Sequence, residues 1–169
     1  RGLGAGTFAA PVQHAAGELP VFIAACKLDK DGRPDLVVAD YGFGFDKISV
    51  FLNTSAGPGS LTFAHTLYGA GERPVAIACA DVDGDGDQDL GIANQDSEDL
   101  TLLLNDGNGA FQAGAGAFAA QDWPRAIAAG DFDGDGRPDF AIANYQSSTV
   151  SVLLNQGSGT FAPQTVYTV

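Results

Sequence analysis

The sequence predicts an all-β fold built from three consecutive copies of one short antiparallel unit. The 169 residues include 23 glycines and 8 prolines, which is typical of a chain with many tight turns. The Val, Ile, Leu and Phe residues stand in short runs between these turn residues rather than in long helical stripes. One set of motifs also occurs three times along the chain, and such internal repeats define the architecture of a protein.

Each copy opens with a proline and an apolar run, which predicts its first strand. These runs begin at Pro20, Pro74 and Pro124. An acidic loop follows, which reads KLDKDGRPDL from Lys27, DVDGDGDQDL from Asp81 and DFDGDGRPDF from Asp131. A second apolar run, at residues 36–39, 90–93 and 140–143, predicts the second strand. Both strands are apolar throughout, as expected for strands that are buried on both faces.

The second half of each copy predicts two further strands. The third strand ends on an asparagine, at Asn53, Asn105 and Asn155. Because only Asn53 lies in a glycosylation sequon, we expect the shared role of these asparagines to be capping of the turn that follows. A glycine-rich turn and a phenylalanine then lead into the fourth strand, at Phe63, Phe111 and Phe161.

The acidic loops begin at residues 27, 81 and 131, a spacing of 54 and then 50 residues. That spacing is close to one four-stranded β-propeller blade, which has roughly 40–50 residues. We therefore predict three blades, at residues 18–70, 71–120 and 121–169. Residues 1–17 repeat the end of a unit, which predicts an extra N-terminal strand, near residues 7–16, from the outer edge of a preceding blade.

Three blades leave two apolar flanks open, whereas closed propellers have about 4–8 blades. The sequence thus predicts a partial propeller. Either a second copy of the chain completes it, as a homo-oligomer, or the remaining blades belong to a missing part of a longer protein. The absence of methionine and the start within a motif favour a fragment or a processed product.

The second and third acidic loops have the spacing of calcium-binding loops. Ca²⁺ takes six to eight oxygen ligands, and a tight loop can supply them from alternate positions. The predicted ligands are the Asp81, Asp83, Asp85 and Asp89 side chains with the Asp87 carbonyl, and the Asp131, Asp133, Asp135 and Asp139 side chains with the Arg137 carbonyl. The alternative, solvated Asp-Gly turns, is disfavoured because carboxylates at this density repel one another.

The first loop departs from this pattern because Lys27 replaces the first aspartate. Its remaining candidate ligands are Asp29, Asp31, Asp35 and the Arg33 carbonyl. We expect this third site to be weak or empty, since the Lys27 ammonium could fill the loop itself by pairing with the carboxylates.

These loops, together with the later LLN-x-G-x-G-x-F segment, resemble FG-GAP/VCBS repeats, which integrin α-subunits also carry in their propellers. The resemblance implies calcium on one face of the propeller and a protein or glycan ligand on the other. It places candidate ligand-binding residues at Tyr41, Arg73, Trp123 and Tyr145. The aromatic side chains among Tyr41, Phe43, Phe45, Trp123 and Tyr145 could stack on a sugar or peptide, or could simply cover blade edges.

Several function classes are disfavoured. The formal net charge of −13 disfavours nucleic acid as a partner. We find no nucleophile–base pair or phosphate loop, so we expect no enzyme activity, and His14 and His65 have no partner pattern. No membrane-spanning segment is visible. Cys26 and Cys79 are offset by one residue in equivalent strands, so we expect two buried free thiols rather than a disulfide.

The leading hypothesis is a calcium-stabilised binding or adhesion module outside the cell, where calcium is plentiful. The alternatives are a self-assembling structural unit and an accessory domain of a secreted carbohydrate-active enzyme.

Overall fold

A computed structural model describes residues 2–4, 7–8, 10–44, 46–57 and 60–169. Phe45, one of the predicted stacking aromatics, lies outside the described residues. The described part of the chain contains no helix long and apolar enough to cross a membrane.

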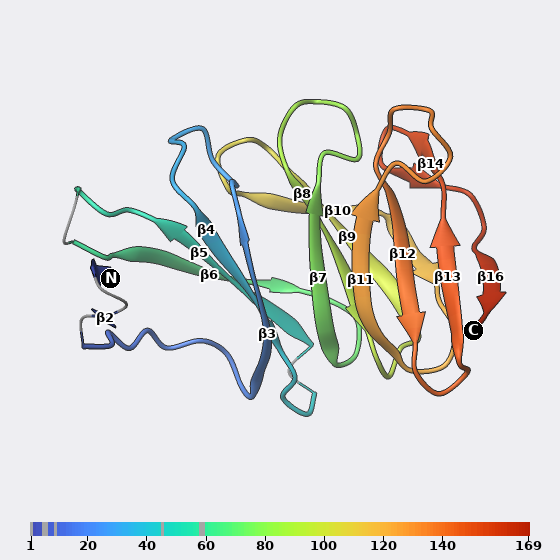
Figure 1. The fold of residues 1–169 in the computed structure, drawn as a ribbon, viewed down its shortest axis with the longest axis horizontal. Coiled ribbons are helices and arrows are strands. Elements are labelled where there is room, and N and C mark those ends of the chain that lie inside the picture. The colour runs from blue at the N-terminus through green and yellow to red at the C-terminus, as the bar shows by residue number, and fades with distance from the viewer. Residues whose placement is uncertain (1, 5–6, 9, 45, 58–59) are drawn as a thin grey trace.

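Three four-stranded antiparallel sheets form the body of the molecule, side by side along its long axis (Figure 1). The first contains, in spatial order, β3 (Pro20–Cys26), β4 (Asp35–Asp40), β5 (Lys47–Asn53) and β6 (Phe63–Gly69). The second contains β7 (Pro74–Ala80), β8 (Asp89–Asn94), β9 (Asp99–Asn105) and β10 (Phe111–Ala119). The third contains β11 (Pro124–Gly130), β12 (Asp139–Asn144), β13 (Thr149–Leu153) and β16 (Thr165–Thr168), and the short pair β14 (Asn155–Gly157) and β15 (Thr160–Phe161) forms its closing hairpin. Each sheet is one blade, which confirms the predicted all-β propeller architecture.

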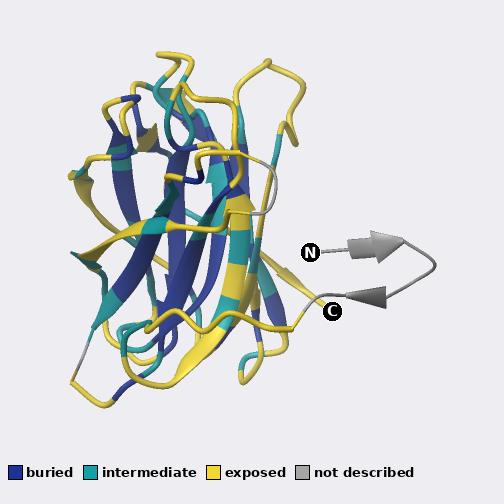
Figure 2. Cartoon of the chain, turned by 90° about the vertical axis from the view of Figure 1, so that its left-hand side faces the viewer, coloured by how far each residue is buried: buried dark blue, intermediate teal, exposed yellow. Residues whose placement is uncertain are grey.

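Burial differs between the blades although their sequences follow one pattern (Figure 2). In the middle blade, Val75 and Ile77 of β7 are 7% and 3% exposed. The equivalent residues of the first blade, Val21 and Ile23, are 53% and 60% exposed. The difference arises because the middle blade has a neighbour on both faces, whereas no other blade covers the outer face of the first among the residues that the structure describes. The open flanks that the sequence predicted are therefore present.

Two hydrophobic cores lie between the blades rather than within them. One, between the first and second blades, includes Leu28, Ile48 and Leu90, and the other, between the second and third, includes Leu100 and Phe140. Burying these side chains removes apolar surface from water, at about 25 cal/mol per Å². Stacking of neighbouring blades is thus the main source of stability.

The N-terminal strand is shorter than predicted. β2 (Thr7–Phe8) pairs with β1 (Gly2–Gly4), but residues 10–19 form no strand. Within the described residues, no neighbouring strand edge offers this segment a ladder of hydrogen bonds. It is held instead by single contacts, such as the bond from the Gly17 amide to Ser49 Oγ (3.1 Å).

The two cysteines form a disulfide, so the prediction of free thiols is wrong. Cys26 ends β3 and Cys79 stands one residue before the end of β7, and their Cα atoms are 6.3 Å apart. Their side chains do lie on opposite faces of equivalent strands, as the offset predicted. Neighbouring stacked blades, however, present opposite faces to each other, so such side chains point at one another. The bond therefore joins the first blade to the second.

Asp40 is a buried carboxylate where the other two copies carry Asn94 and Asn144. Its Oδ2 accepts a hydrogen bond from Ser49 Oγ (2.8 Å), but its Oδ1 has no partner within the described residues. Burial raises the pKa of Asp40, although the Ser49 bond opposes this shift. The charged form of Asp40 is therefore less favourable in the folded state than in the unfolded state.

Asp40→Asn should consequently stabilise the protein near neutral pH by about 1 kcal/mol. Because the folded pKa of Asp40 lies above its unfolded value, the contribution of this group to stability is fully present only below about pH 4. That contribution is lost as pH rises through the folded pKa. Urea unfolding from pH 4 to 8 should show the substitution flattening this decline. A variant no more stable than the parent at pH 7 would contradict the account.

Candidate metal centres and recognition face

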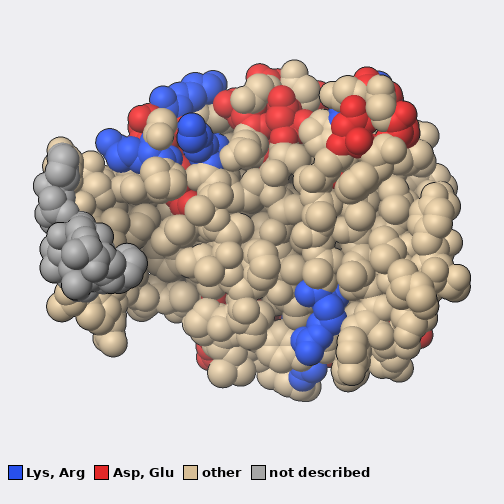
Figure 3. All heavy atoms as spheres, viewed as in Figure 1, with Lys and Arg blue, Asp and Glu red and all other residues tan. Residues whose placement is uncertain are grey.

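Two clusters of carboxylates occupy the loops between the first and second strands of the second and third blades. They are Asp81, Asp83 and Asp89 in one loop and Asp131, Asp133 and Asp139 in the other, and each residue offers an oxygen within 4.8 Å of the others. Figure 3 shows the acidic atoms gathered along one edge of the molecule, over these loops. Three convergent carboxylates in a tight loop match the oxygen donors that Ca²⁺ requires.

Asp89 anchors the second loop from beneath. It is fully buried, and its two oxygens accept hydrogen bonds from the amides of Val82 and Asn105, both at 2.9 Å. Burial, together with the charges of Asp83 and Asp85, raises the pKa of Asp89 to about 6, against the opposing effect of the two hydrogen bonds. A cation in the loop would relieve this electrostatic cost.

The loop backbone holds the remaining carboxylates in place. Asp81 accepts hydrogen bonds from the amides of Gly84 (2.8 Å) and Gly86 (3.0 Å). These two glycines have φ values of +85° and +94°, which side-chain-bearing residues rarely adopt. Asp83 accepts from the amide of Asp85 (3.1 Å), and burial raises its pKa. The glycines therefore permit the turn that the sequence predicted.

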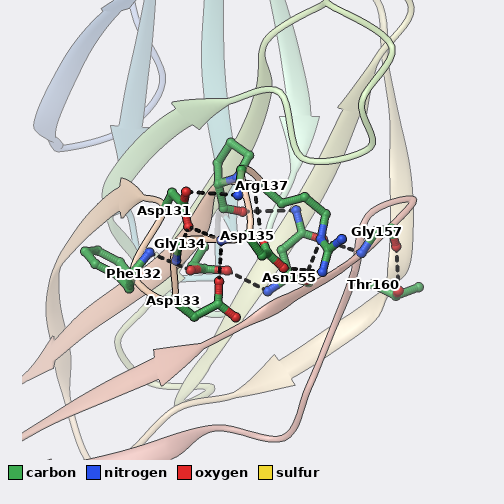
Figure 4. Close-up of polar contacts among 12 residues, drawn as sticks. Asp131, Phe132, Asp133, Gly134, Asp135, Arg137, Asn155, Gly157 and Thr160 are labelled. Atoms are coloured by element: carbon green, nitrogen blue, oxygen red, sulfur yellow. Dashed lines mark hydrogen bonds and ion pairs between the residues drawn. The ribbon is translucent and has the colours of Figure 1, made fainter.

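The third loop repeats this arrangement (Figure 4). Asp131 accepts hydrogen bonds from Gly134 (2.7 Å) and Gly136 (2.9 Å), and the buried Asp139 accepts from the amides of Phe132 and Asn155, both at 2.8 Å.

The fifth positions of the two loops differ from the prediction. Asp85 and Asp135 lie outside the two clusters. Asp135 forms an ion pair with Arg137, whose Nε also donates to the Asn155 carbonyl (2.9 Å). Asp87 occupies the position in the second loop that Arg137 occupies in the third, and it forms an ion pair with Lys30 of the first blade (3.4 Å). The structure thus brings together three of the four side chains predicted for each loop.

The first loop contains no such cluster among the described residues. Asp35 is buried and binds the amides of Leu28 and Asn53, both at 2.8 Å, as its counterparts do. Asp29 accepts from the Asp31 amide (3.0 Å), and Asp31 pairs with the Arg33 side chain. The prediction that Lys27 fills the loop is wrong, because within the described residues its ammonium forms no ion pair.

The three repeated asparagines cap their turns as predicted, and Asn105 and Asn155 also join neighbouring blades. Asn105 Oδ1 accepts from the amide of Gly107 (3.1 Å), while its Nδ2 donates to the Leu28 carbonyl of the first blade (2.9 Å). Asn155 Nδ2 donates to the Val82 carbonyl of the second blade in the same way (2.9 Å). Sequence reasoning missed this second role because nothing in one repeat specifies how it meets the next.

The candidate ligand-binding residues lie at the opposite edge, where the first strands begin. Arg73 lies over the rings of Tyr41 and Phe43, with its Cζ 5.1 and 4.5 Å from their centroids, and forms an ion pair with Asp96 (3.2 Å). Tyr41 and Arg73 are therefore brought together as the resemblance implied. Figure 3 shows basic atoms at this edge, away from the acidic loops.

Tyr145 and Trp123 join this edge less directly. Tyr145 is 70% exposed and Trp123 is 42% exposed. The Trp123 carbonyl accepts a hydrogen bond from the Tyr145 amide (2.8 Å), and the equivalent bonds recur at Leu19 and Arg73. The three residues whose carbonyls accept these bonds all have φ near +50°, which makes this corner a feature of the repeat.

Arg125 and Gln95 connect the aromatic residues of different blades. Gln95 Nε2 donates to the Tyr41 hydroxyl (3.1 Å), and Arg125 Nη1 donates to Gln95 Oε1 (3.3 Å). The Arg125 guanidinium lies 5.9 Å from the centre of the Tyr145 ring. Arg125 was not among the predicted site residues. The sequence signal that could identify Arg125 is its position directly after Pro124, where the other two copies have Val21 and Val75.

A family model described as an FG-GAP-like repeat matches residues 27–92, 81–142 and 131–169. The chain belongs to the FG-GAP-like repeat family. The matches cover all three loops, so this membership rests on the same residues as the geometry above.

Among solved structures, the chain is similar to a lectin from Agrocybe aegerita described as recognising non-reducing terminal N-acetylglucosamine. The TM-score is 0.56 and the identity 23%, over 85% of this chain and 37% of the lectin chain. This likeness supports the fold, and this chain spans well under half of the lectin's length. No curated protein sequence matches the chain.

Proposed function

We propose that this chain is a non-catalytic, calcium-stabilised binding module that acts outside the cell and recognises a glycan. The observation that carries the proposal is the separation of two edges, one with clustered carboxylates and one with exposed aromatic residues and arginines. FG-GAP-like repeats are typical of extracellular proteins, and the Cys26–Cys79 disulfide suits an oxidising environment.

The calcium part of the proposal rests on the second and third loops. Asp81, Asp83 and Asp89 would hold one ion, and Asp131, Asp133 and Asp139 a second. A bound ion would supply charge neutralisation and fix the loop, while these carboxylates and the glycine turns orient the donors. The first loop, without a cluster, supports no third ion.

The glycan part rests on the opposite edge. Tyr145, Trp123 and Phe43 are exposed aromatic side chains, and aromatic rings with a polar rim are typical of recognition surfaces. The likeness to a lectin supports a sugar as the ligand class.

Replacing the exposed aromatics should weaken glycan binding. We expect Tyr145→Ala and Trp123→Ala each to reduce affinity by about tenfold, because truncating a central contact costs more than 1 kcal/mol. A glycan array would first identify a bound sugar, and isothermal titration would then compare the variants. Tyr167→Ala is the matched control, since Tyr167 is equally exposed (55%) but lies on the outer strand β16. An equal loss of glycan affinity in all three variants, or an array on which the parent protein binds no glycan, would reject this part of the proposal.

A second candidate function, assembly through the open flanks, is favoured by one observation. Phe132 is 51% exposed, whereas its equivalents Leu28 and Val82, each packed against the next blade, are 1% exposed. At the other end, Asn53 Nδ2 donates to the Pro34 carbonyl (3.1 Å) within its own blade. No described residue of a neighbouring blade accepts a hydrogen bond from Asn53, as the Leu28 carbonyl does from Asn105. The exposed face of the third blade in one copy would therefore pack against the exposed face of the first blade in another copy.

Light scattering tests this assembly. Paired copies should show twice the chain mass of 17.3 kDa, and Phe132→Asp should return the mass to that of one chain. Phe132→Leu, which keeps an apolar side chain like that of Leu28, is the control and should still pair. A parent protein that is monomeric at all concentrations tested would rule out assembly of this chain with itself.

A further inference from the structure

A cavity opens between the three blades at the edge where their first strands begin. Its volume is about 350 Å³, within the range of small-ligand sites, and Val21, Phe22, Tyr41, Val75 and Arg125 line it. Each blade contributes to it, since these residues come from β3, β7, β11 and the residue that follows β4. Three of these side chains are apolar, while Tyr41 contributes a phenol and Arg125 a guanidinium, so the lining is mixed.

Arg125 differs from the other arginines whose side chains the structure describes. Arg33 pairs with Asp31, Arg73 with Asp96 and Arg137 with Asp135. Arg125 has no carboxylate partner among the described residues, although the chain has 21 acidic residues and only 8 basic ones. The nearby Asp96 is already used by Arg73 (3.2 Å).

Gln95 holds this arginine in position. The Gln95 side chain is 2% exposed and bridges Tyr41 and Arg125 by its two amide atoms, at 3.1 and 3.3 Å. The bond to Gln95 is the one hydrogen bond that the Arg125 guanidinium donates within the described residues, so most of its donors remain free. A buried amide that orients a cation at the rim of a cavity prepares that cation for an external acceptor.

We propose that Arg125 binds the carboxylate of an acidic sugar, with the ring of that sugar against Phe22 and Val75. The proposal rests on the glycan-binding function proposed above and names its ligand class. A guanidinium can donate two parallel hydrogen bonds to a carboxylate, whereas a neutral sugar offers no such acceptor. The apolar side chains of Phe22 and Val75 suit the C–H face of a sugar ring, and Tyr41 offers a hydroxyl beside it.

The acidic loops do not oppose an anionic ligand at this cavity, because they lie on the opposite edge of the molecule (Figure 3). Asp96, the carboxylate beside Gln95, is paired with Arg73 (3.2 Å). The screening length in physiological salt is about 8 Å, and the acidic edge therefore has little influence on a ligand at this cavity.

The experiment compares uronic-acid oligosaccharides with their methyl esters, which lose the carboxylate charge, gain one methyl group and keep the rest of the sugar unchanged. On an array of both forms, followed by isothermal titration, the parent protein should prefer the acids by about tenfold to a hundredfold, the value of a hydrogen bond to a charged group. Arg125→Gln should reduce this preference to near unity. Lys27→Gln, which removes the same charge at the opposite edge, is the matched control and should keep the preference. Melting temperatures would confirm that both variants are folded.

The outcomes separate this inference from the function on which it rests. Acids and esters bound equally by the parent, or a preference that survives Arg125→Gln, would overturn the inference and leave glycan binding intact. Absence of binding to acidic, esterified and neutral glycans alike would overturn both.

Discussion

Calcium at 1 mM or above is expected to raise the melting temperature of this protein by about 10–20 °C, and a chelator should reverse the rise. An ion present at about 100 times its dissociation constant stabilises the folded state by about 2.7 kcal/mol per site. Two sites would thus contribute about 5 kcal/mol, and each kcal/mol moves the melting temperature by about 2–4 °C at this chain length. Differential scanning calorimetry with and without chelator measures the shift directly.

The double variant Asp83→Asn/Asp133→Asn should abolish most of this rise. In each loop the amide oxygen of asparagine can still accept the hydrogen bond that Oδ1 now accepts from Asp85 or Asp135 (3.1 Å), so the turn is preserved while the charge is lost. Without calcium the variant should melt slightly higher than the parent, because fewer carboxylates repel one another.

Asp29→Asn is the control for these two sites. Asp29 belongs to the loop in which the structure shows no carboxylate cluster, so this variant should keep the full response to calcium. A parent melting curve that is the same with calcium and with chelator would refute both metal centres.

Features confined to one repeat could be predicted from the sequence. The order of strands, the capping asparagines and the glycine turns of the second and third loops follow from local patterns, because each depends on residues that lie close together in the sequence. The clusters around Asp89 and Asp139 belong to this class, since the ninth-position aspartate and the loop are adjacent in the chain.

Features that depend on how blades meet could not be predicted in this way. The sequence places Cys26 and Cys79 on opposite faces of their strands, but nothing in one repeat shows that stacking turns these two faces toward each other. The same holds for Arg125, because its partners Gln95 and Tyr145 lie in the turns that follow β8 and β12, and Gln95 belongs to another blade. Lys27 does not fill its loop, because within the described residues its ammonium pairs with no carboxylate. Arg33, two residues after Asp31, forms an ion pair with Asp31 instead.

Removing the disulfide should lower the free energy of unfolding by about 4 kcal/mol. The bond joins residues 53 positions apart, and closing a loop of this length restricts the unfolded chain by about that amount. Cys26→Ala/Cys79→Ala is the suitable variant, because alanine leaves no polar thiol between the first two blades. Urea unfolding of the variant, and of the parent with and without reductant, measures the loss. Alkylation of both cysteines in the denatured parent without reductant would show that the bond does not form.

The same variant also tests whether the disulfide and the calcium loops act independently. Cys79 stands two residues before Asp81, so the bond fixes the strand that leads into the second loop. If the bond only restricts the unfolded chain, the calcium-induced rise in unfolding free energy should be unchanged in the variant, since distant effects add. A smaller rise would mean that the bond also positions the loop for the ion. Asp83→Asn in the parent and in the variant completes the cycle, and a coupling above about 0.5 kcal/mol would establish that link.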